Sequence, residues 1–223
     1  TTPTRMRTLL QLAYLYRERG DLFLASVLAR VCLDLARSNG DDATAAGVWN
    51  TLGNIAHDEQ RHDEAMAAYG EALALLEGIG EREEMRVTLL INIGGCTVGA
   101  GRFEHGVRTL REAHATAVRR GYRRAAALAL TRIGEAYLGR DGRDEALRYF
   151  TESDRLASRS SESYHDILFL NAYRRWQVAT EDGHGTREKI AFGRLRHLRS
   201  LLQRRFPEVD AFDRHVERTR RHA

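Results

Sequence analysis

The stretch WNTLGNIAHDEQRHDEA, from Trp49 to Ala65, decides the fold of this chain. Before its polar turn, large and small residues follow helical spacing: Trp49, Leu52, Gly53 and Ala56. Residues three or four apart share one face of a helix. A small residue on one helix that faces a small residue on the next lets the two backbones approach closely. The stretch therefore predicts two antiparallel helices joined by a short turn, with Gly53 facing Ala65.

Turn signals recur along the whole chain at intervals of 40 or 41 residues. They are Gly20-Asp21, Arg61-His62, Gly101-Arg102, Gly142-Arg143 and Gly183-His184. Glycine and short polar residues end helices because they tolerate a left-handed backbone or compete for its hydrogen bonds. The small positions recur as well, so that Gly94 and Gly106 repeat the pair Gly53 and Ala65 one period later. The pattern predicts an all-α chain of about five antiparallel helical hairpins.

This order of large and small residues resembles the tetratricopeptide repeat over about residues 6 to 157. The period is longer than the ~34 residues typical of that family. The proline that often closes a unit is replaced by Arg37 and Glu77 in the first two units. HEAT and armadillo arrays have comparable periods, but the small-residue pattern disfavours them. The resemblance implies a right-handed superhelical solenoid.

The expected organisation is a single solenoid domain over residues 1–223. Its units are about 6–40, 44–80, 84–120, 124–158 and 163–206, followed by a capping helix over 208–218. The fifth unit is degraded, because Arg174 stands where other units have Ala or Gly and its turn, EDGHGT, is about five residues longer. Solenoid ends need a cover for the last apolar face, and the segment after Pro207 has the amphipathic pattern of such a helix.

The composition indicates a helical protein and disfavours binding to membranes or nucleic acids. The chain has 43% hydrophobic residues, two prolines, and two cysteines that lie inside helical patterns. This composition predicts a helical protein in a reducing, cytoplasmic setting, with no membrane partner. The net charge of +4 is concentrated near the C-terminus. The arginines there include Arg194, Arg196, Arg199, Arg204 and Arg205. No aromatic residues are interleaved for base stacking, which disfavours direct nucleic-acid binding.

The resemblance implies a concave surface lined by the first helix of each hairpin, which suits a peptide or protein segment. The candidate contact residues are Tyr14, Arg17, Asn50, Asn54, His57, Ile91, Glu135, Asn171 and Arg175. Asn50 and Asn54 are the strongest of these, since they lie one helical turn apart and each side-chain amide offers a donor and an acceptor to a peptide bond. The alternative interpretation is that they are solvated surface residues.

No pattern indicates catalysis, a cofactor or a metal site. The run GGCTVGAG, residues 94–101, lacks the preceding strand and the Lys of a phosphate-binding loop. His57 and His62 are five residues apart, whereas helical metal ligands are spaced by three or four. Cys96 has no His or Asp at a sequence spacing that suggests a nucleophile. The chain is therefore expected not to be an enzyme and to have no cofactor.

Two functional hypotheses follow. The preferred one is a non-catalytic scaffold that holds a peptide or protein segment. The alternative is the sensor and dimerisation domain of a bacterial transcriptional regulator, whose DNA-binding domain would lie upstream of Thr1; a homodimer fits this hypothesis. The full-length gene distinguishes the two. Direct binding of RNA or DNA by the basic C-terminus is a third option, which predicts an affinity that falls steeply with salt.

Overall fold

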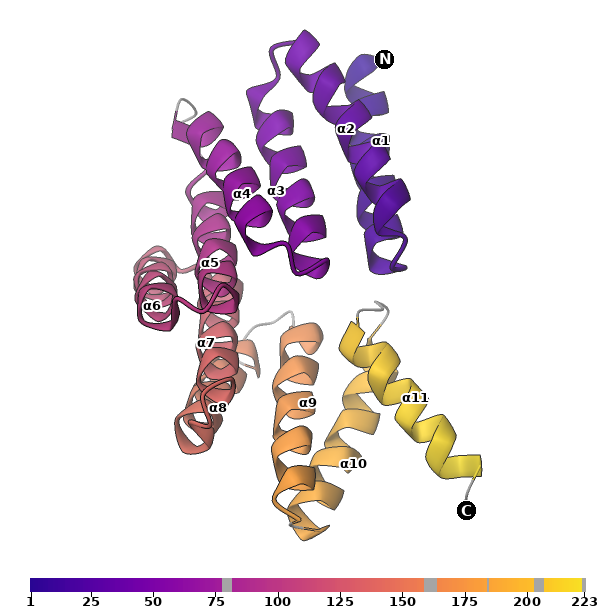
Figure 1. Cartoon of the computed structure of the whole chain (residues 1–223), viewed down its shortest axis with the longest axis vertical. Helices are drawn as coiled ribbons and strands as arrows, with labels where there is room; N and C mark the ends of the chain where they lie inside the picture. The colour runs from indigo at the N-terminus through magenta and orange to yellow at the C-terminus, as the bar shows by residue number, and fades with distance from the viewer. Residues whose placement is uncertain (78–81, 159–163, 184, 203–206, 222–223) are drawn as a thin grey trace. The chain divides into compact units, whose positions relative to one another are not determined.

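The computed structural model describes residues 1–77, 82–158, 164–183, 185–202 and 207–221, which form eleven α-helices (Figure 1). The chain divides into two compact units, residues 1–120 and 121–223, and each is described by itself. The all-α, tetratricopeptide-like fold of antiparallel hairpins is confirmed. The expectation of a single domain stays a prediction.

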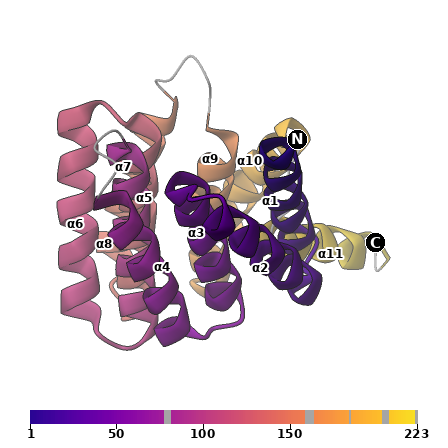
Figure 2. The same ribbon diagram turned by 90° about the horizontal axis from the view of Figure 1, so that it is seen from above.

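Unit 1 contains three hairpins. They are α1 (Thr2–Glu18) with α2 (Leu22–Ser38), α3 (Asp42–Asp58) with α4 (His62–Glu77), and α5 (Glu83–Gly99) with α6 (Phe103–Arg120). Each hairpin packs internally and then against the next, because α3 contacts α1, α2 and α5. Figures 1 and 2 show α3 lying between α1 and α5. The first helices of the three hairpins are thus neighbours.

Unit 2 contains two hairpins and a final helix. They are α7 (Arg123–Leu138) with α8 (Arg143–Ser158), α9 (His165–Glu181) with α10 (Gly185–Leu201), and α11 (Pro207–Arg221). The predicted longer turn in the fifth hairpin is wrong, because α10 already begins at Gly185. Phe212 of α11 is buried edge-on against Phe169, with ring centroids 5.9 Å apart. The final helix therefore caps the last hairpin, as the sequence predicts.

Local chemistry explains the helix ends. Asp21 and Asp41 cap α2 and α3, because each carboxylate accepts the backbone N–H three residues ahead, at 3.0 and 2.9 Å. Each hairpin turn contains one residue with a left-handed backbone. These residues are Gly20, Gln60, Gly101, Asp141 and Gly183. The turn signals of the sequence thus mark the places where the chain reverses.

The helices pack closely at the small residues that the sequence predicts to be contact points. A Cβ atom on Gly94 would lie 3.1 Å from the carbonyl oxygen of Gly106, which confirms that pair. At Gly53 the space is filled by the ring of Tyr69, whose Cε1 would lie 2.4 Å from an added Cβ. The pairing of Gly53 with Ala65 stays a prediction, and the large side chain of Tyr69 covers this glycine.

Candidate functional site

Three asparagines form a hydrogen-bonded group on the first helices of unit 1. Asn92 Nδ2, on α5, donates to Asn50 Oδ1 at 3.2 Å and to Asn54 Oδ1 at 3.3 Å, both on α3. The hydroxyl of Tyr69 also donates to Asn54 Oδ1, at 2.9 Å. We call Asn50, Asn54 and Asn92 the amide cluster. All three are half-buried, so the cluster reaches the surface of unit 1.

The amide cluster leaves donors for another molecule. The Oδ1 atoms of Asn50 and Asn54 are engaged, which directs each Nδ2 group away from Asn92. Among the residues that the structure describes, these two Nδ2 groups donate no hydrogen bond. Two amide donors one helical turn apart can hold carbonyl oxygens of a peptide.

The neighbouring candidates in unit 1 have partners of their own. Arg17, on α1, donates to Asp58 of α3 through Nε at 2.6 Å and Nη2 at 3.2 Å. Tyr14 is half-buried on α1. Ile91 is completely buried, so the expectation that its side chain contacts a partner is wrong. The residue that reaches Asn50 is Asn92, one position further along α5.

The candidates of unit 2 belong to internal networks. Asn171 is completely buried, where its Nδ2 donates to Ser153 Oγ at 3.0 Å and to Asp154 Oδ1 at 2.8 Å. Thr131 Oγ1 donates to Asn171 Oδ1 at 2.8 Å. The expectation that Asn171 lies on a binding surface is therefore wrong, because this side chain joins α7, α8 and α9.

Glu135 and Arg175 border open pockets of unit 2. Glu135 Oε2 accepts from Arg132 at 2.9 Å, and Arg174 contacts Oε1 at 2.9 Å, beside a pocket of about 330 Å³. Burial raises the pKa of Glu135, but the two guanidinium groups more than offset this and hold that pKa below its usual value. Arg175 Nη1 pairs with Asp154 at 2.6 Å beside a more apolar pocket of about 250 Å³.

Arg194 and Arg199 of the C-terminal basic stretch form ion pairs within unit 2, whereas Arg196 is exposed. Arg194 contacts Asp154 at 2.9 Å, and Arg199 contacts Asp213 at 3.0 Å. Arg204 and Arg205 lie outside the described residues. Ion pairing within unit 2 thus accounts for Arg194 and Arg199 without a nucleic acid.

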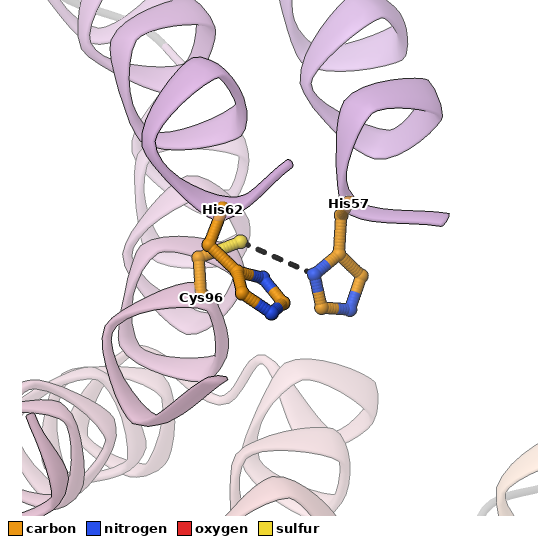
Figure 3. Close-up of side chains that lie close together, drawn as sticks. All are labelled: His57, His62 and Cys96. Carbon is orange, nitrogen blue, oxygen red and sulfur yellow. Dashed lines mark hydrogen bonds between the residues drawn. The ribbon is translucent and has the colours of Figure 1, made fainter. Parts of the chain in front are cut away.

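Sequence spacing missed one side-chain cluster. His57, His62 and Cys96 each offer a ligand atom, and these atoms lie within 4.8 Å of one another (Figure 3). The three residues come from α3, α4 and α5, so the ligand spacing of a single helix does not describe them. Cys32 is not part of this cluster. It is buried, its thiol donates to the Met6 carbonyl at 3.3 Å, and burial is the main cause that raises its pKa.

These features define a tetratricopeptide-repeat-like helical repeat protein. The family model described as "Tetratricopeptide repeat" matches residues 46–75, which include the stretch that predicts the fold. Comparison with curated proteins gave no match. The described residues include no helix with the length and apolar character needed to cross a membrane.

Solved structures share the fold at low sequence identity. BtubC (BKLC) from P. vanneervenii is 20% identical with a TM-score of 0.64, over 87% of this chain and 80% of that chain. PilF of Pseudomonas aeruginosa is 18% identical with a TM-score of 0.57, over 88% and 77%. A Rap protein complexed with Competence and Sporulation Factor is 13% identical with a TM-score of 0.78, over 90% of this chain and 55% of that one.

Proposed function

We propose that this chain is a scaffold that binds a peptide or protein segment on the face of unit 1 formed by α1, α3 and α5. The observation that carries the proposal is the pair of Nδ2 donors on Asn50 and Asn54, which have no acceptor among the described residues. The Rap protein of the same fold, which was solved in complex with a factor, supports binding as the use of this architecture.

The amide cluster suits recognition of a peptide backbone. Asn92 and Tyr69 fix the orientation of the two α3 amides before a ligand arrives, which lowers the entropy lost on binding. Amide N–H groups bind a backbone carbonyl whatever the side chain of the ligand. The Arg17–Asp58 pair lies at the end of the same α3 face and offers charged groups to flanking side chains of the ligand.

The test begins with selection of peptides from a displayed random library on the purified chain. Isothermal titration then compares the wild type with the double variant Asn50→Ala, Asn54→Ala. Loss of two hydrogen bonds, at ~0.5 to 1.5 kcal/mol for each bond, predicts an affinity that is weaker by about 5-fold or more. The matched control is Arg30→Ala, Glu71→Ala, because both residues are exposed on the second helices α2 and α4. Equal affinities of all three proteins would refute the proposed surface.

The sensor-domain hypothesis concerns the rest of the gene and stays a prediction, as do the cytoplasmic setting and a homodimer. The full-length gene, and not the peptide selection, separates the two functions. Selected peptides that bind through the amide cluster fit both, whereas a DNA-binding domain encoded upstream of Thr1 would identify the regulator.

A further inference from the structure

His57, His62 and Cys96 meet at the lower end of the α3–α4 hairpin, as Figure 3 shows. His57 lies in the last turn of α3, His62 is the first residue of α4, and Cys96 lies in the last turn of α5. Cys96 Sγ is 3.3 Å from His57 Nδ1. The two imidazole centroids are 5.6 Å apart. One thiol and two imidazoles therefore converge from three helices.

The turn between α3 and α4 holds the two histidines in place. Gln60 has a left-handed backbone, and its N–H donates to the His57 carbonyl at 2.9 Å. Arg61 pairs with both Glu59 and Glu64 across the same turn. The four residues between His57 and His62 thus reverse the chain and bring the rings to the same side.

Gly99 makes room for His62. A Cβ atom at this position would lie 2.6 Å from Cε1 and 2.7 Å from Nε2 of the His62 ring. Such distances are well inside van der Waals contact, so any larger residue would push the ring away. The α5 helix therefore provides the thiol and, at Gly99, the space that the His62 ring needs.

One nitrogen atom of the cluster lacks a hydrogen-bond partner among the described residues. His62 Nδ1 is buried and has no hydrogen-bond partner among the described residues. A buried polar nitrogen without a partner is costly, and each such atom in a folded protein calls for an explanation. A bound cation near this ring would supply one.

We propose that His57, His62 and Cys96 bind a zinc ion. Imidazole nitrogens and a thiolate are the donors that Zn²⁺ prefers, at ~2.0 to 2.3 Å, which places tetrahedral ligand atoms roughly 3.3 to 3.6 Å apart. The separation of 3.3 Å between Cys96 Sγ and His57 Nδ1 already fits. Three protein ligands leave the fourth position to water or to a donor of a bound molecule.

Binding has a defined proton balance. Zinc displaces the Cys96 proton, so one proton is released for each ion bound through the thiolate, and the affinity falls as the pH falls. Cys96 is completely buried, whereas both histidines are half-buried. The ion therefore enters from the histidine side. This proposal does not depend on peptide binding.

The test uses the tag-free chain, kept reduced by a phosphine and stripped of metal. Zinc is titrated against a chromophoric chelator, and Co²⁺ serves as the spectroscopic probe. The expected result is one zinc per chain, together with a thiolate-to-cobalt charge-transfer band and the visible bands of tetrahedral Co²⁺. Cys96→Ser should abolish the charge-transfer band, and Cys96→Ser, His57→Gln and His62→Gln should each weaken zinc binding at least about 10-fold.

Matched variants keep the test decisive. Cys32→Ser removes the other buried thiol and His105→Gln an exposed histidine of α6, and neither should alter binding. Gly99→Ala leaves all three ligands in the chain but displaces the His62 ring, so it should weaken binding as well. Circular dichroism without metal verifies the fold of each variant; if Cys96→Ser fails to fold, His57→Gln and Gly99→Ala decide. Wild type without stoichiometric zinc, or binding unaffected by the site variants, overturns the proposal.

Discussion

Arg17 and Asp58 are 41 residues apart, one repeat period, and two hydrogen bonds of 2.6 and 3.2 Å join them. The pair fastens the C-terminal end of α1 to that of α3. Each side chain is about one quarter exposed, at 23% and 27%, so solvent weakens the attraction only partly. A side chain at one position of a hairpin is thus paired with the side chain near the same position of the next.

Replacing Asp58 should loosen the contact between the first two hairpins. We expect Asp58→Ala to lower the free energy of unfolding by about 1 kcal/mol, since it removes a two-point, charge-assisted pair. Urea denaturation at low and high salt measures the change. The control is Asp63→Ala, whose carboxylate is 92% exposed and should matter little. Equal effects of the two variants would show that the Arg17–Asp58 pair adds no stability.

The adjacent glycines of α5 offer a matched pair of substitutions. A Cβ on Gly94 would lie 2.7 Å from Leu110 Cγ, whereas a Cβ on Gly95 meets nothing within 4 Å. We expect Gly94→Ala to destabilise the chain by about 1 to 3 kcal/mol through overpacking. Gly95→Ala should stabilise it by up to ~1 kcal/mol, because Ala favours the helix. Thermal unfolding of both variants should give shifts of opposite sign; shifts of the same sign would contradict the close approach of α5 and α6.

The buried network around Asn171 should be sensitive to truncation. Asn171→Ala leaves Thr131, Ser153 and Asp154 without a shared partner in the core of unit 2. We expect a loss of about 2 to 4 kcal/mol, from a cavity and unsatisfied polar groups. Ser200→Ala is the control, because that hydroxyl is exposed and donates to the His197 carbonyl in the preceding turn. A change below about 0.5 kcal/mol in Asn171→Ala, within the range of surface substitutions, would place this residue at the surface.

Glu135 should make the stability of the chain depend on pH. Its pKa in the folded state is below the ordinary value of 4.5, because Arg132 and Arg174 outweigh the effect of burial. The contribution of the Glu135 carboxylate to the free energy of unfolding is therefore complete at a pH above the ordinary pKa. It is lost as the pH falls through the lower pKa of the folded state. Glu135→Gln should be less stable than wild type at pH 6. The difference between the free energies of unfolding of the two proteins should become smaller below about pH 4. Denaturation curves from pH 3 to 7 measure it; a gap that widens in acid would reverse the assigned direction.

The hairpins could be predicted because their signals are local. Gly94 and Gly106 lie within one repeat, and a spacing of three or four residues identifies their helical faces directly. The turns were predictable for the same reason, although Gln60 and Asp141 adopt left-handed conformations where glycine is the usual residue.

The side-chain contacts between hairpins could not be predicted in the same way. A strict period of 41 residues aligns Ile91 with Asn50, yet Asn92 makes the contact and Ile91 is buried. The same period predicts that Asn171 lies on the surface, although its side-chain amide is buried and hydrogen-bonded inside unit 2. The meeting of His57, His62 and Cys96 depends on how three helices pack, and their distances along the chain do not reveal it. A search for polar residues one period apart, with one residue of tolerance, would have found Asn92.

Polar pairs about one period apart make the hairpins distinguishable from one another. Arg124 contacts Asp166 at 3.0 Å across 42 residues, and Thr131 contacts Asn171 at 2.8 Å across 40, just as Arg17 meets Asp58 in unit 1. Apolar packing alone would not distinguish one neighbouring hairpin from another. An arginine that needs a carboxylate on the next hairpin does distinguish them. The polar pairs between neighbouring hairpins therefore help to fix the order of the hairpins. Exchanging two hairpins would leave charged side chains without their partners.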